Sequence, residues 1–247
     1  MRWVAEQGTG RGIREQHIDI LLSRPEQAST RLRNAVGEVL DEEERQRALR
    51  FVFDRDRDLY IFSHGLLRLV LARYLGVDPR ELCFALAKGG RPELAWPSST
   101  PIRFNLSHTK GLVACIVTSR ADCGVDVERI DRVDYRRLVP SVLATEELSA
   151  LMTLTEECRR HRFFEIWTLK EAYLKGRGLG ISYPVRNISF SGFDGTRRCL
   201  VTADSEDDGS AWRFWSKTLT HTHSAAAAVR TTGNDISFSL ISAEDLP

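Results

Sequence analysis

Acidic side chains interrupt two stretches of this sequence that otherwise look buried. Asp126 and Glu128 alternate with Val125 and Val127 in the segment CGVDVERID, and Glu171 lies in FFEIWTLKEAYLKGRG. Burying a carboxylate costs several kcal/mol unless it is paired with a cation or holds a metal. Because strand side chains alternate between the two faces, the spacing predicts that Asp126 and Glu128 leave the same face of one strand.

The stretch around Glu171 has the pattern of a helix that is mostly covered by protein, expected from Arg159 to Lys175. Apolar residues recur nearly all round it: Phe163, Phe164, Ile166, Trp167, Leu169, Ala172, Tyr173 and Leu174. Glu171 and Lys175 are four residues apart and so share one helix face, with Lys170 beside them. Each acidic stretch also has a simpler interpretation, as a solvated strand face or as an ordinary surface ion pair.

The composition is that of an ordinary folded protein of 247 residues, enough for one large domain or two halves. A formal net charge of +1 provides no excess positive charge for a nucleic acid or an acidic membrane, so neither partner is expected. The first residues lack the apolar core of a signal peptide, and no run of about 18 apolar residues occurs. The five cysteines are scattered without C-x-x-C spacing, which predicts reduced thiols. We therefore expect a soluble cytoplasmic protein.

Periodicity and turn residues predict a chain in which helices alternate with short strands. Helices are expected at Arg31 to Val39, Asp41 to Arg50, Asp56 to Leu75, Tyr135 to Leu143, Thr145 to Leu154 and Arg159 to Lys175. Strands are expected at His17 to Leu22, Arg103 to Ser107, Leu112 to Thr118, Val125 to Val127, Val185 to Phe190, Arg198 to Thr202, Trp212 to Thr220, Ala225 to Val229 and Ile236 to Ile241. A turn is expected at Lys88 to Pro92 and an irregular loop at Trp96 to Pro101.

The short polar stretch from Ser119 to Cys123 is the expected boundary between two halves, residues 1–120 and 121–247. A weak internal echo supports related halves, since SHTKG precedes the apolar LVACIV and THTHS precedes AAAAV. If the halves pack as a dimer within one chain, a ligand would sit in the cleft between them.

Three carboxylates without a histidine or cysteine ligand set suit a hard cation such as Mg²⁺, which is often bound together with substrate phosphates. Basic groups that could meet such phosphates are present in Arg55 or Arg57, Arg91, His108 and Lys175. The adjacent Ser107 and His108 could suggest a serine hydrolase, but the G-x-S-x-G elbow is missing and neighbours on an extended chain point apart.

These features converge on one family. FNLSHTKG (104–111), GVDVE (124–128) and WTLKEAYLKGRGLGIS (167–182) together closely resemble the Sfp-type 4′-phosphopantetheinyl transferases. Weaker matches, GGRP (89–92) and RFVFDRD (50–56), stand upstream in the same order. The resemblance spans roughly residues 42 to 190, and its strength lies in the joint occurrence of the motifs, since each alone is weak.

The resemblance implies an α/β (α+β) fold of two similar halves related by a pseudo-twofold axis, with a monomeric chain. It implies transfer of the phosphopantetheine arm of coenzyme A to a serine of an apo acyl or peptidyl carrier protein, an acidic helical domain. By the same resemblance Asp126, Glu128 and Glu171 bind Mg²⁺, or Mn²⁺ in its place, and Glu171 is the general base. Lys175 contacts the pyrophosphate.

Further coenzyme A contacts follow from the same resemblance. Ser107 and His108 match a pair that meets the 3′-phosphate, and Arg91 matches a basic residue near the nucleotide. Arg55 matches a phosphate contact, and Arg47 is a second candidate for one. The sequence departs from the family where some relatives carry a basic residue before RF and this chain has Glu44. Residues 1 to about 30 match nothing, and the C-terminal strands agree in character only.

Two other functions remain open on the sequence alone. A catalytically silent relative could bind coenzyme A or a carrier protein without transferring anything, although it would not need buried carboxylates. Another Mg²⁺-dependent enzyme, such as a nuclease or phosphatase, would share the acids but would not explain FNLSHTKG or the GGRP turn. The sequence does not indicate which carrier is modified, whether from fatty acid, polyketide, nonribosomal peptide or lysine biosynthesis, or whether acylated coenzyme A is accepted.

Overall fold

A computed structural model gives the architecture of the chain. It describes residues 17–87, 90–130, 134–180, 183–192, 198–201, 207, 209–231 and 236–245. Four expectations fall partly or wholly outside these ranges: the unmatched N-terminal residues 1–16, positions 88–89 of the expected turn, positions 181–182 of the third family motif, and position 202 of the strand expected from Arg198.

Helices and strands follow one another in blocks along the chain: after β1, three helices precede five strands, and three more helices precede the last five strands of the described residues. The helices are α1 (Thr30–Glu38), α2 (Glu42–Ala48), α3 (Asp54–Leu75), α4 (Val139–Val142), α5 (Thr145–Met152) and α6 (Glu156–Arg177), with short 3₁₀ helices at Pro25–Gln27, Pro79–Glu81, Tyr135–Arg137, Val185–Asn187, Thr220–Thr222 and Ala243–Asp245. The strands are β1 (His17–Ser23), β2 (Cys83–Leu86), β3 (Pro92–Trp96), β4 (Ile102–Thr109), β5 (Leu112–Ser119), β6 (Cys123–Arg129), β7 (Ile188–Ser191), β8 (Arg198–Val201), β9 (Trp212–Leu219), β10 (His223–Arg230) and β11 (Ser237–Ser242).

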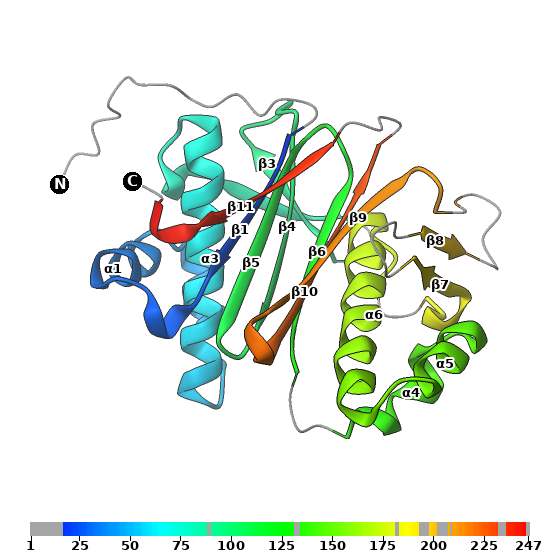
Figure 1. Ribbon diagram of the computed structural model, residues 1–247. Coiled ribbons are helices and arrows are strands. Elements are labelled where there is room, and N and C mark those ends of the chain that lie inside the picture. Colours follow the sequence, from blue (N-terminus) through cyan, green and yellow to red (C-terminus); the bar gives the residue numbers. More distant parts are fainter. Residues whose placement is uncertain are drawn as a thin grey trace.

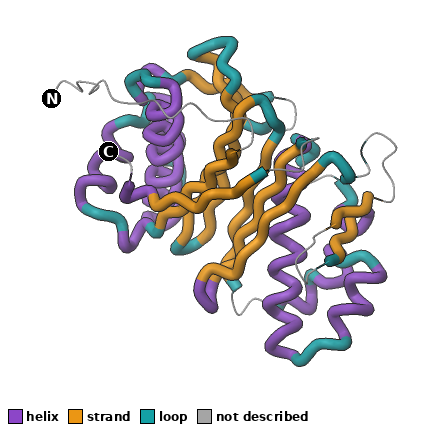
Figure 2. Tube along the Cα trace, turned by 45° about the horizontal axis from the view of Figure 1, so that its top comes forward, coloured by secondary structure: helices purple, strands orange, loops and turns teal. Residues whose placement is uncertain are grey.

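Two sheets lie between two long helices. One sheet has the strand order β11-β1-β5-β4 and the other has the order β6-β10-β9. Helix α3 covers the outer face of the first sheet and α6 covers the outer face of the second (Figures 1 and 2). The inner faces meet in an apolar layer that includes Ile20, Ile116, Val125 and Ala227. The fold is therefore built as helix, sheet, sheet and helix.

The two halves repeat one topology, which confirms the expected fold class. Strands β1, β5 and β4 pair antiparallel in the first sheet, and β6, β10 and β9 pair antiparallel in the second. Helices α3 and α6 each contain 22 residues and end at a glycine with a φ of 68°, Gly76 or Gly178. Glycine adopts this left-handed conformation without a side-chain clash, so both helices stop there. The boundary at residue 120 stays a prediction.

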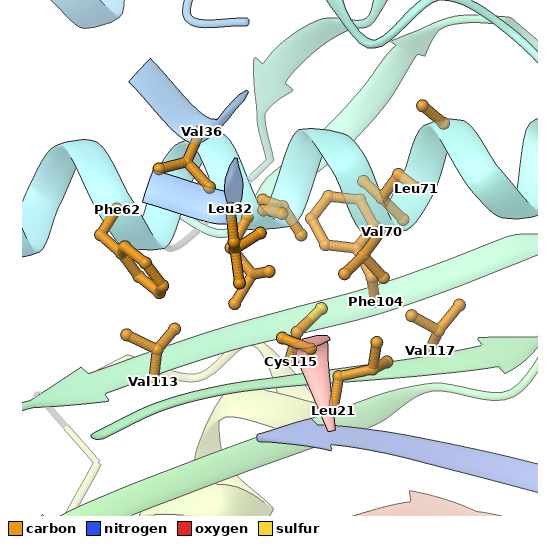
Figure 3. Packing of buried hydrophobic residues seen from close by; sticks show 14 of the residues in the cluster. Leu21, Leu32, Val36, Phe62, Val70, Leu71, Phe104, Val113, Cys115 and Val117 are labelled. Atoms are coloured by element: carbon orange, nitrogen blue, oxygen red, sulfur yellow. The ribbon is translucent and has the colours of Figure 1, made fainter. Parts of the chain in front are cut away.

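Helix α3 packs on its sheet through residues spaced three and four apart. Leu67, Val70 and Leu71 lie in one buried cluster with the sheet side chains Val113 and Cys115 (Figure 3). This spacing places the apolar side chains on one helix face. Each fully buried side chain of this kind stabilises the fold by about 1.5–3 kcal/mol.

In each half, a buried cation on the long helix forms an ion pair with an acid on the shorter helix that precedes it. Arg68 is the fifteenth residue of α3, and its Nε donates to Glu44 Oε2 at 2.7 Å. Lys170 is the fifteenth residue of α6, and its Nζ donates to Glu147 Oε2 at 2.5 Å. Both cations are fully buried, and both acids lie in the first turn of the preceding helix, α2 or α5. The departure at Glu44 thus has a structural reason, because Arg68 needs a carboxylate there.

Most of the predicted elements are confirmed within a few residues, and the errors concern short segments. The helix expected from Tyr135 to Leu143 is divided into a 3₁₀ turn and the four-residue α4. The strand expected from Val185 begins only at Ile188, because Pro184 leads into a 3₁₀ turn over Val185–Asn187. Strands β2 and β3, which flank the predicted turn, were not predicted, since most of their side chains are not buried.

No helix in the described ranges is long and apolar enough to span a membrane. The thiols of Cys83, Cys115, Cys123 and Cys158 are free, as the cysteine spacing predicted.

Gly124→Ala is expected to lower the free energy of unfolding by about 3 kcal/mol, because overpacking a close backbone contact strains the fold. Its new Cβ would lie 2.0 Å from the carbonyl oxygen of Ala172 on α6. Gly37→Ala in α1 is the control, since nothing lies within 4 Å of its added Cβ. Urea unfolding of both variants measures the difference. Equal midpoints would contradict the close approach of β6 and α6.

Candidate active site

The candidate site lies where β4 of the first half runs beside β6 of the second half. Side chains of β4 bond the backbone of β6: Asn105 Oδ1 accepts from Val125 N–H at 3.0 Å, and Ser107 Oγ accepts from Val127 N–H at 3.3 Å. Asn105 and Ser107 are two residues apart and therefore reach from the same face of β4. These bonds fix the position of Asp126, which lies between the two bonded amides.

Asp126 is buried, with 4% of its surface exposed, and forms the centre of the site. Its Oδ1 accepts from Lys175 Nζ at 2.6 Å and from Ser107 Oγ at 3.0 Å. Lys175 Nζ also contacts Ser107 Oγ at 2.9 Å. The ammonium and the hydroxyl offset the desolvation of the carboxylate. The second oxygen, Oδ2, is buried without a hydrogen-bond partner in the described part of the chain.

Glu128 lies beside Asp126 on the same strand, as the alternation predicted. The indole Nε1–H of Trp167, on α6, donates to Glu128 Oε1 at 3.0 Å. Burial raises the pKa of Glu128 to about 7, and the negative charges of Asp126 and Glu171 add to this effect. The Trp167 hydrogen bond and Lys175 act in the opposite direction. The interpretation of this strand as a solvated acidic face is therefore wrong.

Glu171 shares the electrostatic environment of the two strand carboxylates. Burial raises its pKa, the charge of Asp126 raises it further, and Lys175 opposes both effects. Glu171 and Lys175 are not an ordinary surface ion pair, because the Lys175 ammonium reaches across to Asp126 and Ser107. Three carboxylates and one lysine thus act on one another at the contact between the two halves.

Ser107 and His108 point to different sides of β4, as expected for neighbours on a strand. Ser107 is buried at 6% exposure, whereas His108 is exposed. Partial desolvation lowers the pKa of His108, and the nearby His64 and Lys175 lower it further. The ring is therefore predominantly neutral near pH 7 until a negative charge approaches it.

Arg91 connects the first half to the end of α6. Its Nη1 donates to the carbonyl oxygen of Gly176 at 3.1 Å, and its Nη2 donates to Glu93 Oε1 at 2.7 Å. Gly176 immediately follows Lys175, so Arg91 lies at the same end of α6 as the lysine.

Arg55 makes no contact with this cluster in the described structure. It lies in the first turn of α3, where it forms an ion pair with Asp56 at 3.3 Å. Its guanidinium lies 5.2 Å from the ring centroid of Phe53, and its side chain is 71% exposed. Arg47 lies over the ring of Tyr60. The roles predicted for these two arginines therefore stay predictions.

Asp126 and Glu128 fit a magnesium site that is completed by a substrate. Mg²⁺ usually takes one or two protein carboxylates and fills its other positions with water and phosphate oxygens. Asp126 offers the buried, unbonded Oδ2, and Glu128 stands next to it. Within the described ranges no three acidic, histidine or cysteine side chains form a group that could hold a metal by themselves. A ligand role for Glu171 stays a prediction.

Two residues of the site were not predicted from the sequence. Asn105 holds β6 through Val125, and Trp167 bonds Glu128. Both stood within the recognised motifs, but the periodicity of α6 assigned Trp167 to the apolar core. Asn105 and Ser107 are two residues apart, as Asp126 and Glu128 are. This spacing was the feature of the sequence that could have indicated a role for Asn105 beside Ser107.

Glu128→Gln is expected to make the folded protein more stable above pH 7 and to leave its stability nearly unchanged below pH 4.5. Between these values folded Glu128 holds a proton that the unfolded chain releases, so this group lowers stability as the pH rises. Glutamine removes the effect. Urea unfolding across this range compares the variant with the wild type, with exposed Glu146→Gln as control. Parallel pH profiles would contradict the raised pKa.

Comparisons with known proteins agree over most of the chain. Residues 27–120 match the family model for the N-terminal part of 4′-phosphopantetheinyl transferase, and residues 122–230 match the model for the 4′-phosphopantetheinyl transferase superfamily. These two matches confirm the resemblance that the sequence motifs indicated.

Curated relatives carry the same description. The chain is 35% identical over 145 residues to the 4′-phosphopantetheinyl transferase HetI of a Nostoc species, covering 58% of this chain and 61% of HetI. It is 28% identical over 213 residues to a phosphopantetheinyl transferase of Thraustochytrium, covering 81% and 73%. It is 25% identical over 147 residues to Sfp of Bacillus subtilis, covering 60% and 64%. The match thus spans about three fifths of HetI and of Sfp.

Proposed function

The chain belongs to the 4′-phosphopantetheinyl transferase superfamily, and on that premise we propose that it modifies an apo carrier protein. The reaction transfers the 4′-phosphopantetheine arm of coenzyme A to a serine of an acyl or peptidyl carrier protein and releases adenosine 3′,5′-bisphosphate. The observation that carries the proposal is the contact of the partly exposed Lys175 with buried Asp126 and Ser107, with Glu128 and Glu171 beside it.

The transfer needs a base, and Glu171 is suited to this role. The serine oxygen bonds to the phosphorus that carries the pantetheine arm, while the bond from that phosphorus to the oxygen of the adenosine-side phosphate breaks. The serine proton passes to Glu171, directly or through water. A carboxylate with a raised pKa accepts a proton more readily than an ordinary surface glutamate.

Cationic groups surround the place where charge develops. Lys175 stabilises the leaving phosphate, for which its ammonium must exchange its contact with Asp126 for a phosphate oxygen. The motif assigns Ser107 and His108 to the 3′-phosphate. The exposed ring of His108 is free to meet it and gains a proton as the phosphate approaches, whereas the Ser107 hydroxyl is bonded to Asp126 and Lys175. Arg91 contributes near the nucleotide, and Arg55 is retained as a phosphate contact on the strength of its motif alone.

Metal chemistry would complete the site. Mg²⁺, or Mn²⁺ in its place, would neutralise charge on the pyrophosphate when held by Asp126, Glu128 and Glu171. The unbonded Asp126 Oδ2 supports this assignment, since a buried carboxylate oxygen without a partner is costly.

The proposal includes a monomeric protein in the cytoplasm. The two halves pack sheet to sheet, as two subunits of a dimer would, which supports a monomer. Free thiols at four described cysteines are typical of a reducing compartment.

Glu171→Gln is expected to slow transfer about 100-fold or more, because it removes the base while keeping the size of the side chain. The assay incubates apo carrier proteins with the enzyme, coenzyme A and Mg²⁺ and follows the gain of one phosphopantetheine by intact mass. EDTA should abolish the gain.

Glu157→Gln is the matched control, because Glu157 is exposed on the same helix and should leave the rate unchanged. Near-normal transfer by Glu171→Gln would overturn the assignment of the base. No mass gain on any carrier with the wild type, while coenzyme A still binds, would favour a catalytically silent relative.

A further inference from the structure

An apolar loop projects into solvent between α2 and α3. We call residues 49–53 the apolar loop. Four of its side chains are exposed: Leu49 (70%), Phe51 (39%), Val52 (88%) and Phe53 (58%). Single exposed apolar residues are common on protein surfaces. Four exposed apolar side chains within five residues of one loop are instead typical of an interaction site. These residues do not belong to the buried face of α3, because the buried residues of that helix begin at Tyr60.

Two exposed arginines flank this loop, near the exposed acids Glu42 and Glu43 in the first turn of α2. Arg45 and Arg50 are exposed, and neither forms an ion pair with any residue that the structure describes. In contrast, Arg57 pairs with Asp54 at 2.9 Å and with Asp58 at 3.3 Å. The acids that follow the loop are therefore largely neutralised by their own neighbours, and Arg45 and Arg50 remain available to a partner.

A chain of ring contacts leads from the apolar loop to His64 on α3. The ring centroids of Phe51 and Tyr60 are 5.3 Å apart, and those of Tyr60 and His64 are 4.0 Å apart. His64 in turn lowers the pKa of His108, which adjoins Ser107. In Figure 1 the first turn of α3 and the turn between β4 and β5 lie at the same, lower end of the molecule. The loop thus lies at the end of the first half where β4 and β5 are joined, just after His108.

We propose that the apolar loop, with Arg45 and Arg50, is a docking surface for the carrier protein, the acidic helical domain that the family resemblance implies. This inference rests on the proposed function. A protein substrate must dock beside the site for its serine to reach the pyrophosphate, and this surface offers apolar contact together with two exposed arginines that form no ion pair in the described structure. Apolar contact supplies affinity, while the arginines favour an acidic partner.

Substitutions here test docking without disturbing the fold, because the side chains are exposed. Leu49→Ser, Val52→Ser and Arg50→Glu are each expected to raise the KM for the carrier about tenfold, the loss typical of one useful interface contact. The kcat and the KM for coenzyme A should stay within about twofold of wild type, since the chemistry is untouched. Leu240→Ser is the control, because Leu240 is 42% exposed on β11.

Salt provides a second readout. The wild-type KM for the carrier should rise with ionic strength, and Arg50→Glu should weaken this dependence, whereas Val52→Ser should keep it. If the substitutions only disturbed the fold, they would lower the melting temperature or the kcat. The carrier KM of Arg50→Glu and that of Val52→Ser would then depend on salt in the same way.

An unchanged carrier KM in all three variants would overturn the proposal. If sedimentation velocity then shows that wild type self-associates and Val52→Ser does not, the loop binds a second copy of the chain. If instead wild type alone sediments with phosphatidylglycerol vesicles, the loop binds a membrane surface. Failure of the proposed function looks different, because wild type would then transfer nothing to any carrier.

Discussion

The bond between the hydroxyl of Ser107 and the carboxylate of Asp126 joins the two halves of this protein at its most chemically demanding point. A buried carboxylate is tolerated only when charge and hydrogen bonds offset its desolvation. Here the offset comes from both halves: β4 supplies the hydroxyl, and α6 supplies the ammonium of Lys175. The same contacts therefore stabilise the packing of the two halves and position the side chains of the site.

Duplication of the fold did not duplicate the chemistry. Counting back from the glycines that end α3 and α6, Leu69 occupies the position of Glu171, and Arg68 occupies the position of Lys170. The buried cation that anchors each helix is thus present twice, whereas the acid of the site is present once. The first half instead contributes β4, whose Asn105 and Ser107 hold the acidic strand in place. One site for each chain follows from this division of roles.

The sequence predicted those features that depend on local periodicity. The alternation around Asp126 and Glu128 placed both carboxylates on one strand face, and the apolar pattern located α6 closely. Contacts between distant segments could not be read in this way. The two-residue spacing in β4 did not reveal that Asn105 would bond Val125, and helix periodicity could not direct Lys175 to Asp126. The 3₁₀ turn at Val185–Asn187 is too short to have a period.

The most direct test is a crystal structure of the chain with coenzyme A and Mg²⁺. The account predicts a metal ion about 2.0–2.1 Å from Asp126 Oδ2, the usual Mg²⁺ to oxygen distance, with the pyrophosphate against Lys175. It also predicts that Ser107 keeps its bond to the amide of Val127, so that β4 and β6 remain joined. Coenzyme A bound away from the contact between β4 and β6, or a metal that leaves Asp126 unligated, would contradict the account.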